Sequence, residues 1–285
     1  MSMRLRSFLV LVAILTATAA FASPAGAASS GTAAASATAL ACTVADTSTC
    51  VPGRTIVRRN QKWMCDRPLA RYGRLPIKVV VNFSAGRRLN ANGAIDLVTG
   101  CAGDGNSNTI DLIVDVRGNG RTYGAGHDAM KVRQRAGYLR GIQITGVLQC
   151  GPRVRGAHQD GVQLQGGRNI TFVDFRVGRY DLGRSTCQGA GGAFFYSGAS
   201  GYVPTNIDVV RGRFIACNHS LFAGLGSGSV RNARFRSGRT DGTDARCRGF
   251  AGSIPCDIRN AVTLAGNTCQ RWSWSRNRWI ASAPR

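Results

Sequence analysis

The sequence predicts an all-β solenoid, in which short strands and turns repeat along the chain. Val162–Gln165 and Asn169–Phe175 read as two strands joined by a Gly-Gly-Arg turn that is too short for a helix. Comparable strand–turn–strand units occur on both sides, around Met130, Phe194 and Leu221. Degenerate units repeated along a chain are typical of solenoids.

Composition agrees with this fold class. Glycine and asparagine are frequent, lysine is rare and glutamate is absent, which disfavours long helices. No stretch after the N-terminus has a sustained apolar period of 3.6 residues. We therefore expect strands and turns throughout.

The N-terminus has the pattern of a secretory signal peptide. Arg4 and Arg6 precede the apolar run Phe8–Leu15, and small residues at Ala25–Ala27 offer a cleavage site. The apolar run is shorter than the roughly 20 residues that span a bilayer. We expect residues 1–27 to be removed, the mature protein to be secreted and extracellular, and no transmembrane segment to follow.

Ten cysteines follow the signal: Cys42, Cys50, Cys65, Cys101, Cys150, Cys187, Cys217, Cys247, Cys256 and Cys269. An even number on an exported chain indicates structural disulfides. None has the close paired spacing of a zinc site. The local pairs Cys42–Cys50 and Cys247–Cys256 are favoured, and the remaining pairing stays open.

The chain divides into five expected segments. Residues 1–27 are the signal peptide, 28–41 a flexible lead of small residues, and 42–74 a cysteine-containing cap. Residues 75–268 form the solenoid, and the tryptophan-rich 269–285 folds over its far end. Caps are expected because an open end exposes core and unpaired strand edges.

Strand signals recur through the solenoid, separated by Gly, Asn and Asp. The expected strands are Ile77–Phe83, Ala94–Val98, Thr109–Val116, Met130–Val132, Gly141–Thr145, Val162–Gln165, Asn169–Phe175, Gly192–Tyr196, Asn206–Val210, Asn218–Ala223, Val230–Phe235 and Ile258–Leu264.

The segment His158–Gln163, followed by Asn169–Phe172, carries a family resemblance. With it, roughly Leu75 to Asn267 resembles the right-handed parallel β-helix class of the pectate-lyase-like superfamily, and secreted actinobacterial proteins of that class. The resemblance implies a single-stranded, right-handed parallel β-helix with disulfide-stapled terminal caps. It is specific for the architecture and much less so for any reaction.

The net charge of +23 indicates which classes of binding partner to expect. An exported protein this basic adheres to polyanions, such as uronic-acid polysaccharides, teichoic acids, nucleic acid or anionic lipid surfaces. Adhesion without specificity is the alternative. No nucleic-acid reader module is recognisable, so we expect an acidic polysaccharide or an anionic cell-surface polymer as the partner of a monomer.

Aligning the units by their apolar residues predicts which side chains share a face, because side chains alternate along a strand. The inward columns are Met130, Val162, Phe194, Leu221 and Val132, Leu164, Tyr196, Ala223. The outward columns are Lys131, Gln163, Phe195, Phe222 and Arg133, Gln165, Ser197, Gly224.

These outward columns suit an acidic glycan, because cations meet carboxylates, amides meet hydroxyls and an aromatic face stacks on a sugar ring. The candidate substrate-binding residues are Lys131, Arg133, Gln163, Gln165 and Phe195. The alternative is an ordinary solvated sheet face, with the aromatic side chains under a loop.

A second cluster precedes the same strands, and it holds all three histidines of the chain. The candidate catalytic residues are His127, Asp128, His158, Asp160 and His219, with Gln159 and Asn218 beside them. Histidine suits proton transfer near neutral pH, so His158 is the expected acid/base. Asp160 would orient it, or would share a cation with Asp128 or form a carboxylate pair with it; calcium is the only cofactor that these residues suggest. The alternative is that both aspartates cap turn amides.

Two reactions fit the resembled class. Its lyases remove the proton α to a uronate carboxylate, using a base and a group that neutralises the carboxylate; Lys131, Arg133, Arg179 and Asp181 are of suitable types. Its glycosidases use paired carboxylates, but no adjacent Asp-Asp and no Gly-His-Gly is present. We expect action on an acidic polysaccharide as a lyase or glycoside hydrolase, with a non-catalytic binding or scaffold protein as the alternative.

Overall fold

The computed structural model describes residues 42–83, 93–118, 128–133, 140–149, 160–178, 192–196, 202–216, 218–238, 254–258 and 261–285. These all belong to one compact unit, Ala39–Arg285. The predicted signal peptide and flexible lead lie outside the described residues. Within those residues no helix is both long and apolar enough to cross a membrane.

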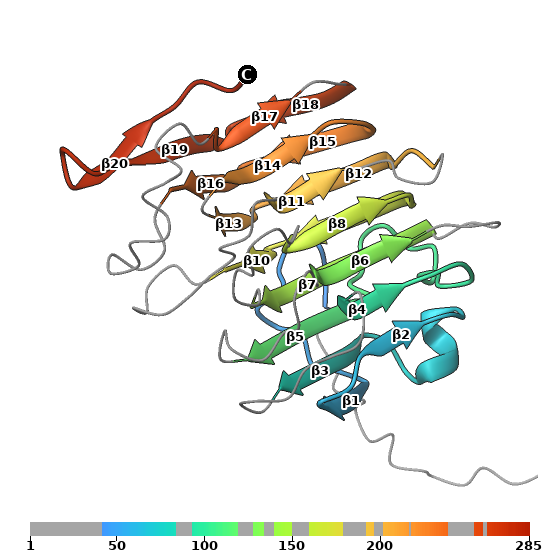
Figure 1. The fold of residues 1–285 in the computed structure, drawn as a ribbon. Coiled ribbons are helices and arrows are strands. Elements are labelled where there is room, and N and C mark those ends of the chain that lie inside the picture. Colours follow the sequence, from blue (N-terminus) through green and yellow to red (C-terminus); the bar gives the residue numbers. More distant parts are fainter. Residues whose placement is uncertain are drawn as a thin grey trace, which may run out of the picture. The chain divides into compact units, whose positions relative to one another are not determined.

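The described chain is nearly all β, and its strands form two sheets (Figure 1). The smaller, seven-stranded sheet contains β2 (Trp63–Cys65), β4 (Gly93–Leu97), β6 (Asp128–Arg133), β8 (Val162–Gln165), β11 (Gly192–Tyr196), β14 (His219–Ala223) and β17 (Cys256–Ile258). A single 3-10 turn, η1 (Leu69–Tyr72), is the only helical element of the described residues.

The larger sheet is thirteen-stranded. It contains β1 (Arg54–Arg59), β3 (Ile77–Phe83), β5 (Leu112–Gly118), β7 (Arg140–Leu148), β9 (Arg168–Val173), β10 (Arg176–Val177), β12 (Thr205–Val210), β13 (Arg213–Ala216), β15 (Ser227–Arg231), β16 (Arg234–Ser237), β18 (Ala261–Ala265), β19 (Thr268–Ser273) and β20 (Arg278–Ala281). It forks at β7, whose first half pairs with β9 and whose end pairs with β10.

The chain passes between the two sheets in a regular order. One strand of the larger sheet separates β4 from β6, and two, β9 and β10, separate β8 from β11. Among the described strands all paired neighbours run parallel except β19 and β20. Parallel neighbours require long connections, and here those connections are the strands of the other sheet.

The predicted inward columns are confirmed. Met130, Val162, Phe194 and Leu221 are in register on neighbouring strands of the seven-stranded sheet, and each is fully buried. Val132, Leu164 and Ala223 form the next buried column. Tyr196 shares their register, but its side chain lies outside the described residues.

Aromatic rings fill the interior between the sheets. Five phenylalanine rings form a row of contacts, in the order Phe175, Phe172, Phe194, Phe214 and Phe235. The centroids of neighbouring rings in this row are 4.9 to 5.4 Å apart. Edge-to-face and stacked contacts at this distance add to the stabilisation that burial itself supplies. The rings therefore connect strands of both sheets through one continuous core.

Two predicted strands are each divided in two, and a third ends earlier than predicted. Asp174 ends β9 and Asn232 separates β15 from β16, both with positive φ, at 48° and 54°. Arg211, with φ of 57°, makes the same turn between β12 and β13. The predicted strand Ile258–Leu264 is likewise shared between β17 and β18. A left-handed residue turns the chain between two strands, so the predicted strands Asn169–Phe175 and Val230–Phe235 were too long, whereas Asn206–Val210 ends where β12 ends.

Three disulfides are described: Cys42–Cys50, Cys65–Cys101 and Cys256–Cys269. The predicted pair Cys42–Cys50 is confirmed. The predicted pair Cys247–Cys256 is wrong, because Cys256 on β17 is bonded to Cys269 on β19, with their Cα atoms 6.0 Å apart. Cys150, Cys187, Cys217 and Cys247 lie outside the described residues.

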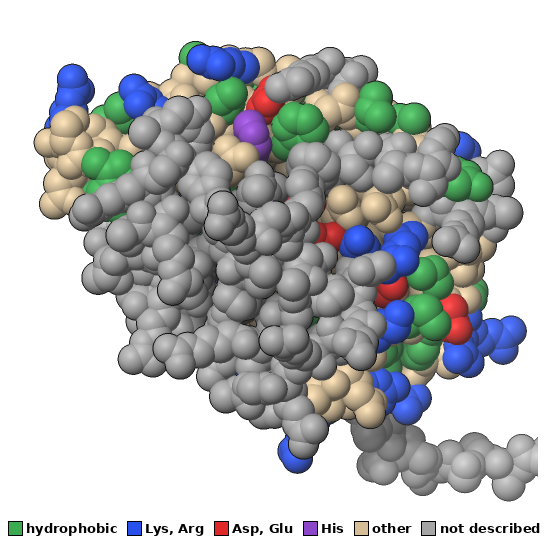
Figure 2. Space-filling model, viewed as in Figure 1, with side chains coloured by type: hydrophobic (Ala, Val, Ile, Leu, Met, Phe, Trp, Pro, Cys, Tyr) green, Lys and Arg blue, Asp and Glu red, His purple; other side chains and the backbone are tan. Residues whose placement is uncertain are grey.

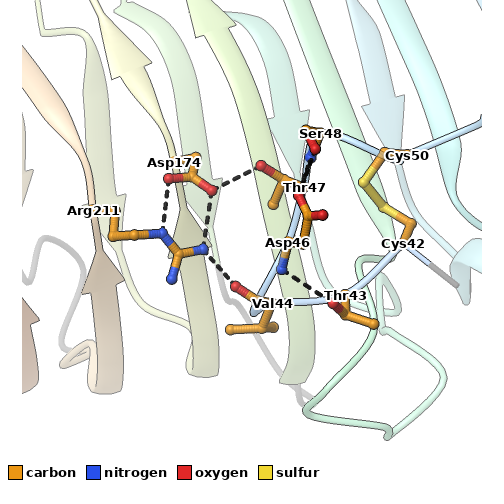
Figure 3. Close-up of a disulfide and its surroundings, with 9 residues drawn as sticks. All are labelled: Cys42, Thr43, Val44, Asp46, Thr47, Ser48, Cys50, Asp174 and Arg211. Atoms are coloured by element: carbon orange, nitrogen blue, oxygen red, sulfur yellow. Dashed lines mark hydrogen bonds and ion pairs between the residues drawn. A yellow bond between two sulfur atoms is a disulfide. The ribbon is translucent and has the colours of Figure 1, made fainter. Parts of the chain in front are cut away.

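The N-terminal cysteine-containing segment has two parts. Strands β1 and β2 stand at the end of each sheet, next to β3 and β4. The stapled segment 42–50 instead lies along the side of the larger sheet (Figure 3). There Thr47 Oγ1 donates to Asp174 Oδ2 (2.7 Å), and the Arg211 guanidinium donates to the Val44 carbonyl (2.5 Å).

The C-terminal segment covers the other end. Strand β20 folds back on β19 as an antiparallel hairpin, with Trp272 opposite Trp279 and their ring centroids 5.2 Å apart. Arg285 then exchanges backbone hydrogen bonds with Cys256 and Ile258 of β17. The chain end therefore occupies polar groups of the last strand of the seven-stranded sheet.

Candidate functional site

One position along from the buried column, neighbouring strands of the seven-stranded sheet carry a second column of residues in register. Its members are Met64, Asp96, Lys131, Gln163, Phe195, Phe222 and Asp257. We call it the Lys131 column. The sequence alignment predicted its middle part, Lys131 to Phe222, in the observed register. Arg133 and Gln165 are neighbours in the next outward column, also as predicted.

Carboxylates lie beside basic side chains on this face, and Figure 2 shows red and blue side chains next to one another. Arg133 Nη2 is 3.0 Å and Lys62 Nζ 3.8 Å from Asp96 Oδ2. The Asp96 side chain is only 3 % exposed, and that of Arg133 is 29 % exposed. Asp96 therefore holds the Arg133 guanidinium in place while leaving part of it at the surface.

Lys131 is held in the same way by Asp128. Their Nζ and Oδ2 atoms are 3.2 Å apart, with the Lys131 side chain 12 % and the Asp128 side chain 2 % exposed. Burial raises the pKa of Asp128 to about 7, and the negative charge of Asp160 adds to the rise. Near neutral pH this carboxyl is partly protonated, so it cancels only part of the Lys131 charge.

The aspartates in front of these strands cap backbone amides. Asp128 Oδ1 accepts the N–H of Asp160 (2.8 Å), and Asp160 Oδ1 accepts the N–H of Gly192 (2.6 Å), both across 32 residues. Asp111 accepts the N–H of Gln143 in the same manner (3.0 Å). These contacts match the capping alternative. Asp160 is fully buried, so it offers no surface to a polymer.

A shared cation between Asp128 and Asp160 lacks support in this geometry, since one oxygen of each faces an amide donor. Among the described residues no group of three or more His, Cys, Asp or Glu side chains is suited to hold a metal ion. The predicted calcium site stays a prediction.

The histidine cluster is described only in part, because His127, His158 and Gln159 lie outside the described residues. His219 is on β14, with Nδ1 3.9 Å from Asp257 Oδ2 and its ring 5.6 Å from that of Phe222. Strands β8 and β11 separate β14 from β6, which puts His219 about 14 Å from the Lys131 strand. His219 therefore belongs to a different part of this face from Lys131.

The remaining predicted residues lie between these two parts. Gln165 Nε2 donates to Gln163 Oε1 (3.1 Å), so the two amides are oriented together and half-buried. The backbone of Phe195 is in register between Gln163 and Phe222, but its side chain lies outside the described residues.

Sequence reasoning missed Lys62, Asp96 and Asp257. The signal for the two aspartates was present, because Ile95-Asp96-Leu97 and Cys256-Asp257-Ile258 repeat the apolar–polar–apolar triplet of Met130-Lys131-Val132. Extending the alignment by one unit in each direction would have placed both in the column.

Comparison with known proteins finds no similar family, protein or structure. No protein-family model matches the chain, and neither a curated protein nor a solved structure is significantly similar to it.

Proposed function

We propose that the chain is a secreted, right-handed parallel β-helix that acts on an acidic polysaccharide along the Lys131 column. The β-helix is supported by the regular passage of the chain between two parallel sheets and by the right-handedness of nearly all parallel crossovers. Secretion is supported by the signal-peptide pattern of residues 1–27.

The observation that carries the function is the pair of anchored cations on the outward face. Asp128 and Asp96 hold the Lys131 amine and the Arg133 guanidinium from below. Holding a side chain in place reduces the entropy lost when it binds a ligand. Arg133 retains further N–H donors that match a carboxylate, and Gln163 and Gln165 supply amides for sugar hydroxyls.

In the reaction we propose, this face holds the chain and His158 transfers the proton. For a uronate polymer, the base removes the proton α to the carboxylate, a carbon–carbon double bond forms, and the glycosidic bond breaks with its electron pair on the oxygen of the leaving sugar, which takes up a proton from water. Arg133 and Lys131 would stabilise the charge that develops on the carboxylate as the proton leaves.

The test is incubation of the mature protein with acidic and neutral polysaccharides, with and without calcium, following ultraviolet absorbance and reducing ends together. A rise in both with an acidic substrate indicates elimination, and reducing ends alone indicate hydrolysis. His158→Ala should abolish either signal while binding is retained. Equal activity of the wild type and His158→Ala would overturn the catalytic assignment.

A second candidate is a non-catalytic binder of the same polymer. It is favoured by the capping roles of Asp128 and Asp160, because two of the predicted catalytic carboxylates are occupied in the fold. Absence of products across the whole panel, together with retention on an acidic polysaccharide at moderate salt, would support the binder.

A further inference from the structure

A second basic surface lies on the larger sheet. Arg176, Arg213 and Arg234 are in register on the parallel strands β10, β13 and β16, and all three are exposed. Each begins its strand just after the left-handed turn made by Asp174, Arg211 or Asn232. We call these three residues the arginine column.

The arginine column borders a cavity of about 570 Å³. Thr47 and Ser48 of the stapled segment also line it, together with Asp174 and Arg211, which lie next to that segment (Figure 3). The cavity is therefore lined by residues from two parts of the chain that are distant in sequence.

The charge in this cavity is strongly one-sided. Among the described residues, its lining contains four arginines and one carboxylate, Asp174. That carboxylate is already bound by Arg211, at 2.9 and 3.0 Å, and by Thr47. Neither Arg176 nor Arg213 is in an ion pair with another described residue. The surplus of positive charge fits an anionic ligand.

The spacing of the arginines selects the kind of anion. Neighbouring parallel strands lie about 4.8 Å apart, so the column presents one guanidinium per strand over about 10 Å. That interval is on the scale of a sugar ring, and a planar guanidinium pairs with a carboxylate through two N–H donors. The described lining holds no aromatic side chain, whereas single-stranded nucleic acids are bound by stacking their bases on such side chains.

We propose that the arginine column is a second binding site, for a linear uronate polysaccharide that runs along the direction in which the strands stack. Each of Arg176, Arg213 and Arg234 pairs with the carboxylate of a sugar unit, and the stapled segment limits the cavity on one side. The site is separate from the Lys131 column and does not depend on its catalytic assignment.

The experiment measures binding of the mature protein to polygalacturonate at physiological ionic strength. The Arg176→Gln/Arg213→Gln/Arg234→Gln variant should lose about tenfold in affinity, since each exposed pair contributes up to about fivefold. The matched control removes three exposed arginines elsewhere, Arg58, Arg59 and Arg71, and should lose less than about twofold.

Equal losses in the two triple variants would overturn the proposal, because net charge alone would then explain binding. Stronger, column-dependent binding of linear polyphosphate than of polygalacturonate would overturn the choice of a uronate ligand. Arg213→Lys keeps the charge but removes the paired donors, and should recover only part of the affinity that Arg213→Gln loses. Circular dichroism of each variant confirms folding.

The outcome is distinguishable from that of the catalytic proposal. A protein with a functional Lys131 column still releases products from short soluble oligosaccharides when the arginine column is removed. A protein without catalysis releases none, yet keeps the tenfold difference in polymer affinity.

Discussion

Basic side chains gather on two surfaces of this protein, and they are held in different ways. On the outward face of the seven-stranded sheet, Lys131 and Arg133 each lie on a buried carboxylate, Asp128 or Asp96, and their side chains are 12 % and 29 % exposed. The arginine column consists of exposed residues, and the one carboxylate in the described lining of the cavity, Asp174, is already bound by Arg211.

Because of this difference, we expect the anchored cations to position a bound ligand and the exposed cations to attract an anionic polymer. Anchored cations contribute a fixed geometry with a small net charge, which suits contact with one sugar unit at a time. Exposed cations contribute a field that salt screens, which suits retention of a long polymer. The net charge of +23 indicates attraction to polyanions, but it does not identify the residues that form either surface.

The largest expected effect tests whether the carboxylates near the Lys131 column belong to the fold. Asp160→Ala removes the acceptor of the Gly192 N–H in a fully buried place. We expect it to lower the free energy of unfolding by about 3 kcal/mol, measured by denaturant titration. The control Asp66→Ala, at an exposed ion pair with Arg67, should cost less than about 1 kcal/mol. Similar stability of both variants would contradict the capping role.

The next effect concerns the wall of the arginine cavity. Cys42→Ser/Cys50→Ser opens the staple across eight residues and should lower the free energy of unfolding by about 2 kcal/mol. Loss of the fixed segment should also weaken polygalacturonate binding at the arginine column. Turnover or binding at the Lys131 column should be unchanged. If both surfaces weaken equally, the segment stabilises the whole fold and does not form a specific wall.

A smaller effect isolates the Lys131 column. In the background that lacks the arginine column, Lys131→Gln should reduce polyuronate affinity about fivefold, the upper value for a partly exposed ion pair. Lys78→Gln on β3 makes the same charge change away from the column and should reduce affinity less than about twofold. Equal reductions would show that Lys131 acts only through net charge.

A further effect is a pH dependence of stability to which the buried Asp128, beside Lys131, contributes. The pKa of Asp128 is about 7 in the folded protein against an ordinary value of 3.8. Between these values the folded state keeps a proton that the unfolded state has lost. Stability therefore falls as the pH rises from about 4 to 7 and is level above that. Asp128→Asn should remove its part of this slope in unfolding measurements from pH 4 to 8, and Asp111, also near 7, should supply the rest.

The same titration separates the two surfaces in binding. As the pH falls from about 8 to 6, protonation of Asp128 frees the Lys131 charge, so affinity at that column should rise. Affinity at the arginine column should stay constant, because a guanidinium does not titrate in this range. Parallel pH profiles for the two columns would contradict the role given to Asp128.

Alternation along single strands was sufficient to predict the register of β6, β8, β11 and β14, four strands of the seven-stranded sheet. Met130, Val162, Phe194 and Leu221 repeat the same apolar–polar pattern, and a shift of one residue would turn every buried side chain outward. The capping of turn amides by Asp128 and Asp160 was one of two readings that the residue types allowed. Only the hydrogen bonds distinguish it from a catalytic pair.

Features that depend on contacts between distant segments were decided by the tertiary structure. Cys256 joins Cys269 because β17 and β19 come together where the chain passes from one sheet to the other. The arginine column lies on strands of two to four residues, too short to show a period, and its register follows from turns at Asp174, Arg211 and Asn232. A local pattern determines which way a side chain points along its own strand, whereas packing between strands determines which side chains become neighbours.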